Sequence, residues 1–209
     1  MGYCEKHNPC DDKRKRKIVT ITISIAIIVT ISIAVPLTIV KFALRPTNLS
    51  FSLQDLTIYQ FNQTSPTTLT TTLHLSLSSH NPSSHFSLSY SGLRFYASYH
   101  SQQITQYALL PPAFLGHYEN CLWSPLLCGV EVPVTPDLAE VLSAEQAAGY
   151  VVIDVKVEAA LKWQFGVVFP GQSHMHVNCR AVVLCDGQNG NGQGGGFRLL
   201  QPVGCSASI

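Results

Sequence analysis

Metal binding by histidine is the first chemistry to consider, because the chain has eight histidines and two of them lie two residues apart. His174 and His176 would point to the same face of a strand, as metal ligands can. No cysteine or acidic residue accompanies them at the spacing of a metal site, so we interpret them as a surface pair. The sequence therefore predicts no metal site.

Catalytic and phosphate-binding patterns give no better candidate. The chain lacks the G-x-S-x-G pattern of serine hydrolases, and its acidic residues show no paired arrangement. Residues 187–196 are rich in glycine, but the helix that a phosphate cradle requires does not follow them. We predict no catalytic residue, no cofactor and no enzymatic activity.

Four residues are candidates for covalent modification. Asn48 and Asn62 each begin an N-x-S/T sequon, and either becomes a glycan site only if it enters the secretory lumen. Asn62 lies in a polar, turn-like stretch and is the better candidate. Cys4 and Cys10 lie near an apolar segment, where cysteines can be palmitoylated.

The other five cysteines follow position 120, and an odd number leaves at least one free or paired with another chain. We expect Cys121 and Cys128 to form a local disulfide if they face an oxidising compartment. Cys179 and Cys185 are six residues apart on a predicted strand, roughly 20 Å, so they cannot bridge each other. We interpret both as core thiols, with a bridge from Cys185 to Cys205 as the alternative.

An apolar segment without charge, Ile18–Val40, divides the chain. If this segment crosses a membrane, the residues before it and after it lie on opposite sides. As a helix it would span roughly 34 Å, enough to cross a bilayer core of about 30 Å. A cleaved signal peptide has an apolar core of only about 7–15 residues and a small-residue cleavage site, so we favour a retained anchor. The basic run at 13–17 predicts that the N-terminus is cytoplasmic and the C-terminal part lies outside.

Charge differs between the two sides of this segment. Residues 1–17 have six Lys/Arg and three Asp/Glu, whereas residues 46–209 have five and nine, giving 5 − 9 = −4. The outer domain is mildly acidic, so we do not expect it to bind nucleic acid.

The outer domain shows period-two alternation of apolar and polar residues, which is typical of strands with one buried face. The pattern is strict from Val151 to Val167, and Gly92 interrupts another stretch. Thr135 and Gly149 are suitable to begin and end one helix. The predicted strands cover residues 69–77, 86–99, 151–167 and 175–185.

The stretch 109–133 contains several prolines, so we expect an irregular loop there. Trp123 lies within it. An exposed tryptophan in a pinned loop would suit contact with a partner, whereas a buried one would cap the end of the sandwich. Both interpretations stay open at this point.

Order and spacing of several motifs resemble a plant family. They are Leu73-x-Leu75-x-Leu77 closing on Asn81-Pro82, a strand ending in Trp163-x-Phe165-Gly166, and Val177-x-Cys179-x-x-Val182-Val183. The sequence is similar to the harpin-induced, non-race-specific disease-resistance-like proteins, whose outer part is a late embryogenesis abundant group-two domain. Cys121 and Cys128 are additional to that pattern.

The resemblance implies a fibronectin-like antiparallel β-sandwich with one short helix, residence in the plasma membrane, and a role in responses to pathogens or stress. It implies no enzymatic activity. We expect a cytoplasmic tail (1–17), a transmembrane helix (18–40), a stalk with the first strand (41–66), the main sandwich (67–186) and a flexible glycine-rich tail (187–209).

Two functions remain for such a molecule. The first is an interaction module that contacts lipid through its span and binds protein partners or further copies of itself. The second is a tethered sandwich that binds a lipid or another small apolar ligand. A filled core would favour the first, and a sizeable apolar pocket between sheets the second.

Overall fold

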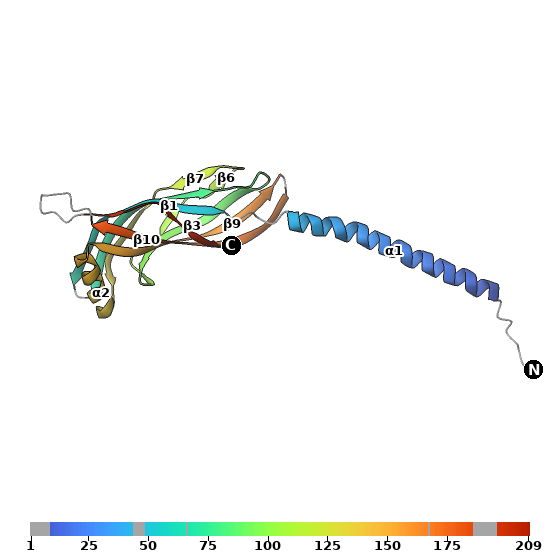
Figure 1. Ribbon diagram of the computed structural model, residues 1–209, viewed down its shortest axis with the longest axis horizontal. Coiled ribbons are helices and arrows are strands. Elements are labelled where there is room, and N and C mark those ends of the chain that lie inside the picture. Colours follow the sequence, from blue (N-terminus) through green and yellow to red (C-terminus); the bar gives the residue numbers. More distant parts are fainter. Residues whose placement is uncertain (1–8, 44–48, 66, 167, 186–195) are drawn as a thin grey trace, which may run out of the picture. The chain divides into compact units, whose positions relative to one another are not determined.

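The computed structural model divides the chain into two compact units, residues 1–46 and 47–209 (Figure 1). The structure describes residues 9–43, 49–65, 67–166, 168–185 and 196–209.

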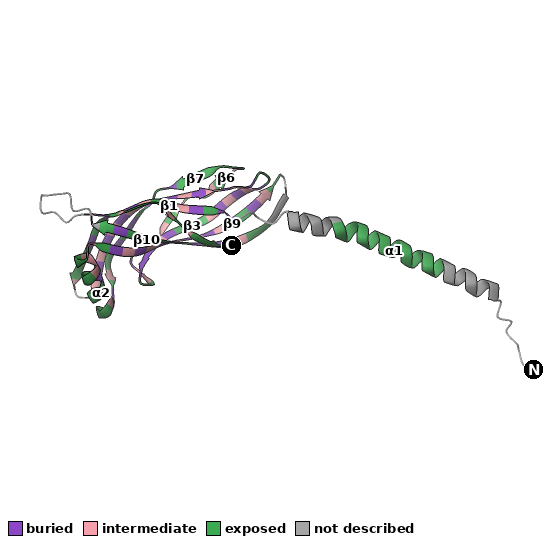
Figure 2. Ribbon diagram, viewed as in Figure 1, coloured by how far each residue is buried: buried purple, intermediate pink, exposed green. Residues whose placement is uncertain are grey.

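The first unit contains one helix, α1, which spans Pro9–Ala43. Its apolar residues from 18 to 35 are all exposed (Figure 2). Hydroxyl groups within it return to carbonyls one turn earlier: Thr22 donates to Val19 at 2.9 Å and Ser24 to Thr20 at 2.9 Å. This internal bonding conceals polar groups from an apolar surrounding, as a helix in lipid requires. The prediction of an apolar helix over this segment is confirmed.

The second unit is mainly β, with one helix and thirteen strands among its described residues. The elements are β1 (Ser50–Ser65), β2 (Thr68–His80), β3 (Ser87–Tyr99), β4 (Gln102–Gln103), β5 (Ala108–Leu110), β6 (Ala113–Leu115), β7 (Asn120–Trp123), β8 (Leu126–Pro133), α2 (Pro136–Ala147), β9 (Tyr150–Phe165), β10 (Val168–Cys185), β11 (Phe197–Leu199), β12 (Val203–Gly204) and β13 (Ser206–Ser208).

The strands form one curled antiparallel sheet with the order β4-β3-β9-β10-β11-β1-β2-β7, and β8 also pairs with β2. β11 joins one half, built around β9, to the other half, built around β1 and β2. The inner faces carry the core, where Tyr90, Phe95 and Tyr99 are at most 1% exposed. The predicted mainly β, antiparallel fold is confirmed.

The predicted alternation sets the faces of the long strands. β9 is one continuous strand, and all its odd residues from Val151 to Trp163 are buried. In β3 the register against β9 shifts between Ser91 and Arg94, and Gly92 there has φ +62°. The shift is a bulge that exchanges the inward and outward positions, which explains why the alternation is interrupted at Gly92 although β3 is one strand.

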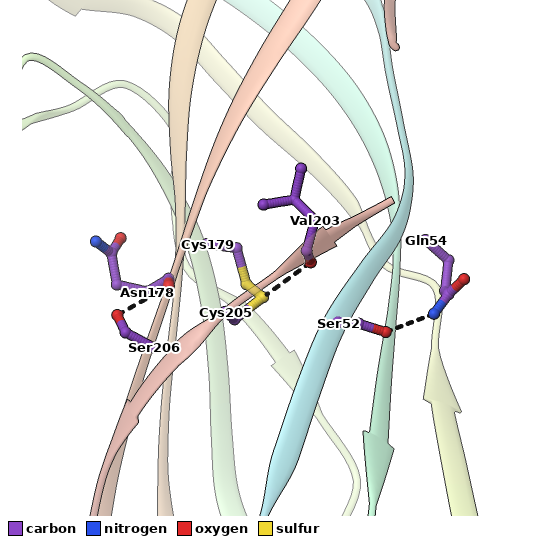
Figure 3. The surroundings of a disulfide bond; sticks show 7 residues. All are labelled: Ser52, Gln54, Asn178, Cys179, Val203, Cys205 and Ser206. Carbon is purple, nitrogen blue, oxygen red and sulfur yellow. Dashed lines mark hydrogen bonds between the residues drawn. A yellow bond between two sulfur atoms is a disulfide. The ribbon is translucent and has the colours of Figure 1, made fainter. Parts of the chain in front are cut away.

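The C-terminal segment is not the flexible tail that the glycine-rich sequence predicts. β11 pairs with both β1 and β10, β12 pairs with β1, and β13 pairs with β10. Cys179 on β10 forms a disulfide with Cys205, which lies between β12 and β13 (Figure 3). The segment from 197 to 208 therefore fills the seam between the two halves, and residues 187–195 of the predicted tail lie outside the described residues.

A second connection closes the opposite side. The amide of Gln106 donates to the carbonyl of Cys128 at 2.8 Å, so the chain after β4 crosses onto β8. A Cβ at Gly129 would overlap the carbonyl oxygen of Ile104, so only glycine allows this approach. The stretch 109–133 is also more regular than predicted, because it contains β5 to β8.

Helix α2 covers one end of the sheet. Gln63 donates to the carbonyl of Ala139 at 2.9 Å, and Gln146 donates to the carbonyl of Phe61 at 3.0 Å. Leu142 is buried, and Gly149 with φ +82° follows the helix, as predicted. Thr135 occupies the N-cap position but makes no side-chain capping bond.

Candidate functional site

Asn81, the first residue of the sequence motif, is fully buried and organises a turn. Its side-chain amide donates to the carbonyls of Phe86 at 2.7 Å and Gly116 at 2.8 Å, and its side-chain oxygen accepts from the amide of Ser83 at 3.1 Å. It thus holds the β2–β3 connection against the chain after β6. This arrangement uses the whole side chain for structure and leaves none of it for a ligand.

The remaining motif residues are also structural. Trp163 is 5% exposed and packs edge-on against Phe86, with ring centroids 6.2 Å apart. Pro82 is half-buried in the turn that Asn81 holds, and Gly166 has φ +55° directly after β9. The motif therefore specifies the fold and does not mark a binding site.

The predicted Cys121–Cys128 disulfide is wrong. Cys121 is paired with Ser79 of β2, and Cys128 with Thr72 of the same strand. Seven residues along a strand separate the two positions by roughly 23 Å, far beyond the reach of a disulfide. Both thiols are free, with Cys128 exposed, and burial raises the pKa of Cys121.

The predicted pairings of the other cysteines need correction too. Cys179 is not a core thiol, because it is bonded to Cys205 with the Cα atoms 4.4 Å apart. That bond excludes the alternative bridge between Cys185 and Cys205. The sequence does not predict this pair, because the pairing of β13 with β10 brings Cys205 beside Cys179 and no local pattern indicates that pairing.

Trp123 is the capping residue and not an exposed anchor. It is 5% exposed, and its ring packs edge-on against Tyr90 and Phe95 with centroids 5.2 and 6.1 Å away. The prediction that this side chain contacts a partner is therefore wrong. Other apolar side chains in the same stretch are exposed, and they include Phe114, Leu122 and Val130 at 61%, 63% and 68%.

The predicted modification sites are only partly described. Asn62 is exposed on β1, opposite Thr70 of β2, so its side chain is open to solvent. Asn48 and Cys4 lie outside the described residues. Cys10 lies within α1, but its side chain is outside the described set.

Two buried tyrosines have perturbed acidity. Burial raises the pKa of Tyr90 to about 12, and a 2.9 Å hydrogen bond with Ser79 partly offsets that effect. The pKa of Tyr99 is raised mainly by burial and secondly by the neighbouring Glu145 carboxylate. Among the described residues, no group lies in hydrogen-bonding geometry to the Tyr99 hydroxyl. Both groups stay protonated at neutral pH and act as core residues.

The surface feature best suited to binding is the outer face, defined as the solvent-facing side of β3, β9, β10 and β11. Two adjoining shallow hollows of about 340 and 410 Å³ lie on it, and both are lined by Glu158 and His176. His174 lines the first hollow and Lys156 the second. The predicted surface placement of His174 and His176 is thus observed, and no group of three metal-ligating side chains occurs among the described residues.

Cations are concentrated on the outer face. The strand register places there every Lys and Arg of residues 46–209, namely Arg94, Lys156, Lys162, Arg180 and Arg198. Only two acidic residues, Asp154 and Glu158, share this face, whereas six acidic residues lie elsewhere in the described part of the domain. A small net negative charge therefore conceals a basic face and an acidic remainder.

The structure defines a class of protein, in which an apolar helix precedes a curled antiparallel β domain in the sequence. The charged side chains described above lie on an open face of the sheet. No protein-family model matches the sequence. A crystal structure of a protein from Archaeoglobus fulgidus aligns with 61% of this chain and 94% of its own, but its TM-score of 0.31 and 8% identity are too low to define the fold.

Curated plant sequences are much more similar. NDR1/HIN1-like protein 12 of Arabidopsis thaliana is 36% identical over 149 residues, which cover 71% of each chain. NDR1/HIN1-like protein 1 of the same plant is 33% identical over 185 residues, covering 88% of this chain and 87% of that one. NDR1/HIN1-like protein 26 is 35% identical over 147 residues and 69% of each chain. The chain belongs to the NDR1/HIN1-like family, which confirms the resemblance seen in the motifs.

Proposed function

We propose that this protein is a single-pass plasma-membrane protein that displays its β domain outside the cell as an interaction module in plant defence or stress signalling. The observation that carries the proposal is the combination of a filled core with a charged open face. The family supports the biological setting, since its relatives are plant proteins whose names refer to NDR1 and HIN1. In this proposal the domain works by binding and not by catalysis.

Two features support the orientation, with the N-terminus in the cytoplasm. The basic run at 13–17 directly precedes the apolar part of α1, as the positive-inside rule requires of a cytoplasmic flank. The Cys179–Cys205 disulfide joins two segments of the domain, and such bonds persist in oxidising compartments. Each observation concerns a different unit of the chain, and both favour the same topology.

The core favours partner binding over uptake of an apolar ligand. Aromatic and aliphatic side chains from both halves of the sheet meet inside, and Leu53, Leu73 and Phe95 are 0% exposed. The described hollows lie on the outer face and not between the halves. Partners in this proposal are proteins, cell-surface components or a second copy of the chain.

Topology is tested with the full chain expressed in plant cells. We expect it to stay in the membrane fraction during alkaline carbonate washing, and external protease to digest the β domain in intact cells. An endoglycosidase should increase its mobility on a gel, and Asn62→Gln should reduce that change because Asn62 is exposed on β1. Release by carbonate, or protection of the domain in intact cells, would contradict the proposal.

A further inference from the structure

The outer face combines four properties that together point to a ligand class. It is basic within an acidic domain, it is hollowed, it presents tyrosine rings, and it keeps a carboxylate at its centre.

The charge on the face is arranged in rows across the strands. Arg94, Glu158 and His176 are cross-strand neighbours in one row, and Tyr96, Lys156 and Asn178 form the next. Arg94 on β3 and Lys156 on β9 thus line the hollows, and His174 and His176 on β10 stand beside them. A face of this kind attracts carboxylates or other anions, most strongly at low ionic strength.

The shape favours an extended chain over a flat surface. The two hollows adjoin through Glu158 and His176, so the depressed surface continues from one row to the next. Small side chains create the first hollow, where Ser91, Gly92 and Ala160 leave space between longer neighbours. A lipid bilayer needs protruding groups to approach it, whereas a linear polymer fits a shallow trough.

The aromatic side chains suit sugar rings. Tyr96 and Tyr107 pack edge-on with centroids 5.1 Å apart, and Arg94 lies 5.7 Å from the centre of the Tyr107 ring. Tyr107 is 48% exposed and Leu109 is 74% exposed beside the first hollow. Such rings offer an apolar surface together with a hydroxyl, as carbohydrate stacking requires.

The central carboxylate distinguishes acidic sugars from phosphate polymers. Glu158 is paired with Arg94 at 2.9 Å and accepts from the Tyr96 hydroxyl at 3.2 Å, yet its side chain is 22% exposed. It can accept hydrogen bonds from sugar hydroxyls, while the surrounding cations bind carboxylates. A phosphodiester chain without hydroxyl groups has no hydrogen-bond donor to offer Glu158, so it would meet this carboxylate only as a repelling charge.

We propose that the outer face binds a linear acidic polysaccharide, a chain of sugar rings that carry carboxylates. The proposal names the partner class of the interaction module and rests on that proposed function, since such polymers would meet the domain outside the cell. Arg94 and Lys156 bind carboxylates, Glu158 and Asn178 bind hydroxyls, and Tyr107 supports a ring.

The test uses the full chain in uncharged detergent micelles, with polygalacturonate as the probe and dextran and polyglutamate as comparison polymers. We expect binding to polygalacturonate that weakens as salt increases, and weaker binding to the other two. Arg94→Gln with Lys156→Gln should reduce the affinity by about tenfold, as expected for two lost charged contacts.

A matched control separates the face from net charge. Gln54→Glu with Ser143→Glu gives the same change of −2 but alters exposed positions on β1 and α2, so we expect less than about a twofold effect. Tyr107→Ala should weaken binding to polygalacturonate while leaving binding to polyglutamate unchanged. Far-ultraviolet circular dichroism must show the same unfolding midpoint for each variant.

Several results would overturn the proposal: no binding to polygalacturonate, equal binding to polyglutamate, an equal effect of the control pair, or preferential binding to phosphatidylserine vesicles or single-stranded DNA. Self-association that is abolished by the Arg94 and Lys156 changes would assign the face to a second copy instead. None of these outcomes affects the topology experiments, so the two proposals can fail separately.

Discussion

At the scale of single residues, the positions that identify the family maintain the fold. Asn81 satisfies two carbonyls and one amide in a buried turn, and Trp163 packs against Phe86 at the end of β9. The residues with binding chemistry, such as Arg94 and Glu158, belong to no motif. The family motif and the proposed binding face are therefore formed by different side chains in this protein.

Replacing Asn81 with alanine should destabilise the domain by about 2–4 kcal/mol, because buried backbone groups lose their hydrogen bonds. Urea unfolding followed by tryptophan fluorescence measures this loss. Asn120→Ala is the matched control, since Asn120 is exposed and bonds only the His80 ring among the described contacts; we expect about 0.5 kcal/mol or less. Equal effects of the two changes would contradict the structural role of Asn81.

The raised pKa of Tyr90 predicts that the domain loses stability in alkali. Its pKa is raised from 10.0 to about 12 in the folded state, so its contribution is complete below pH 10 and is lost as the pH rises through 12. The linked loss amounts to about 2–3 kcal/mol. Urea unfolding between pH 10 and 12 should show this decrease, and Tyr90→Phe should make it shallower. An unchanged pH profile in that variant would assign the alkaline loss to other groups.

At the scale of elements, the domain depends on two closures that join its halves. The segment containing β11, β12 and β13 fills the seam between β1 and β10, and the chain at Ile104–Gln106 crosses onto β8. Both closures cover strand edges whose amide and carbonyl groups would otherwise be open to pairing with other chains. They leave the outer face as the main uncovered surface of that half.

The disulfide should stabilise the first closure. Cys179→Ala with Cys205→Ala removes a cross-link between residues 26 apart in sequence, and we expect a loss of about 3 kcal/mol in unfolding free energy. Cys128→Ala is the control and should change stability little, because that thiol is free and exposed. Alkylation of unreduced protein followed by mass spectrometry should label the exposed Cys128 in the folded domain and Cys121 more slowly, whereas Cys179 should be labelled only after reduction.

The second closure is tested at Gly129. Gly129→Ala should cost about 1–3 kcal/mol, because the added methyl group overlaps the carbonyl of Ile104 and must push the crossing chain away. Gly204→Ala offers a comparison, since a Cβ at that position meets nothing within 4 Å. We expect its unfolding midpoint in urea to stay close to that of the natural chain. Equal losses of stability in the two variants would show that the chain at Ile104 does not pass close to Gly129.

At the scale of the whole molecule, the chain consists of two compact units, residues 1–46 and 47–209. The β domain has its own filled core and both of its closures, so it does not need the helix for its fold. Its charge is divided between a basic outer face and an acidic remainder. The proposed binding face belongs to the sheet alone, so the domain carries this face without the helix.

Residues 47–209 expressed alone should fold to a monomer with an unfolding free energy within about 0.5 kcal/mol of the full chain. Size-exclusion chromatography and urea unfolding check this, with the full chain in detergent as the reference. A fragment that aggregates, or that unfolds at much lower urea, would mean that the first unit contributes to the fold.

Much of the fold could be predicted from local patterns. Period-two alternation identified β9 and its buried face, and Gly92 was recognised as an interruption, which the structure shows to be a bulge within β3. The turn at His100–Ser101 could not be predicted, because both residues have positive φ without being glycine or asparagine. The strands β5 to β8 were missed because their short segments are defined by the partners that they join and not by their own pattern.

The sequence by itself determined the apolar helix, the mainly β architecture, the family and the absence of recognisable catalytic motifs, because periodicity, hydropathy and motif order are local properties of the chain. Only the tertiary structure decided that Cys179 joins Cys205, that Trp123 is buried, that the C-terminal segment is ordered, and that five scattered cations share one face. These features depend on strand order and register, which bring residues together from more than a hundred positions apart. A count of charges records their sum, whereas the pairing of strands decides where each charge lies.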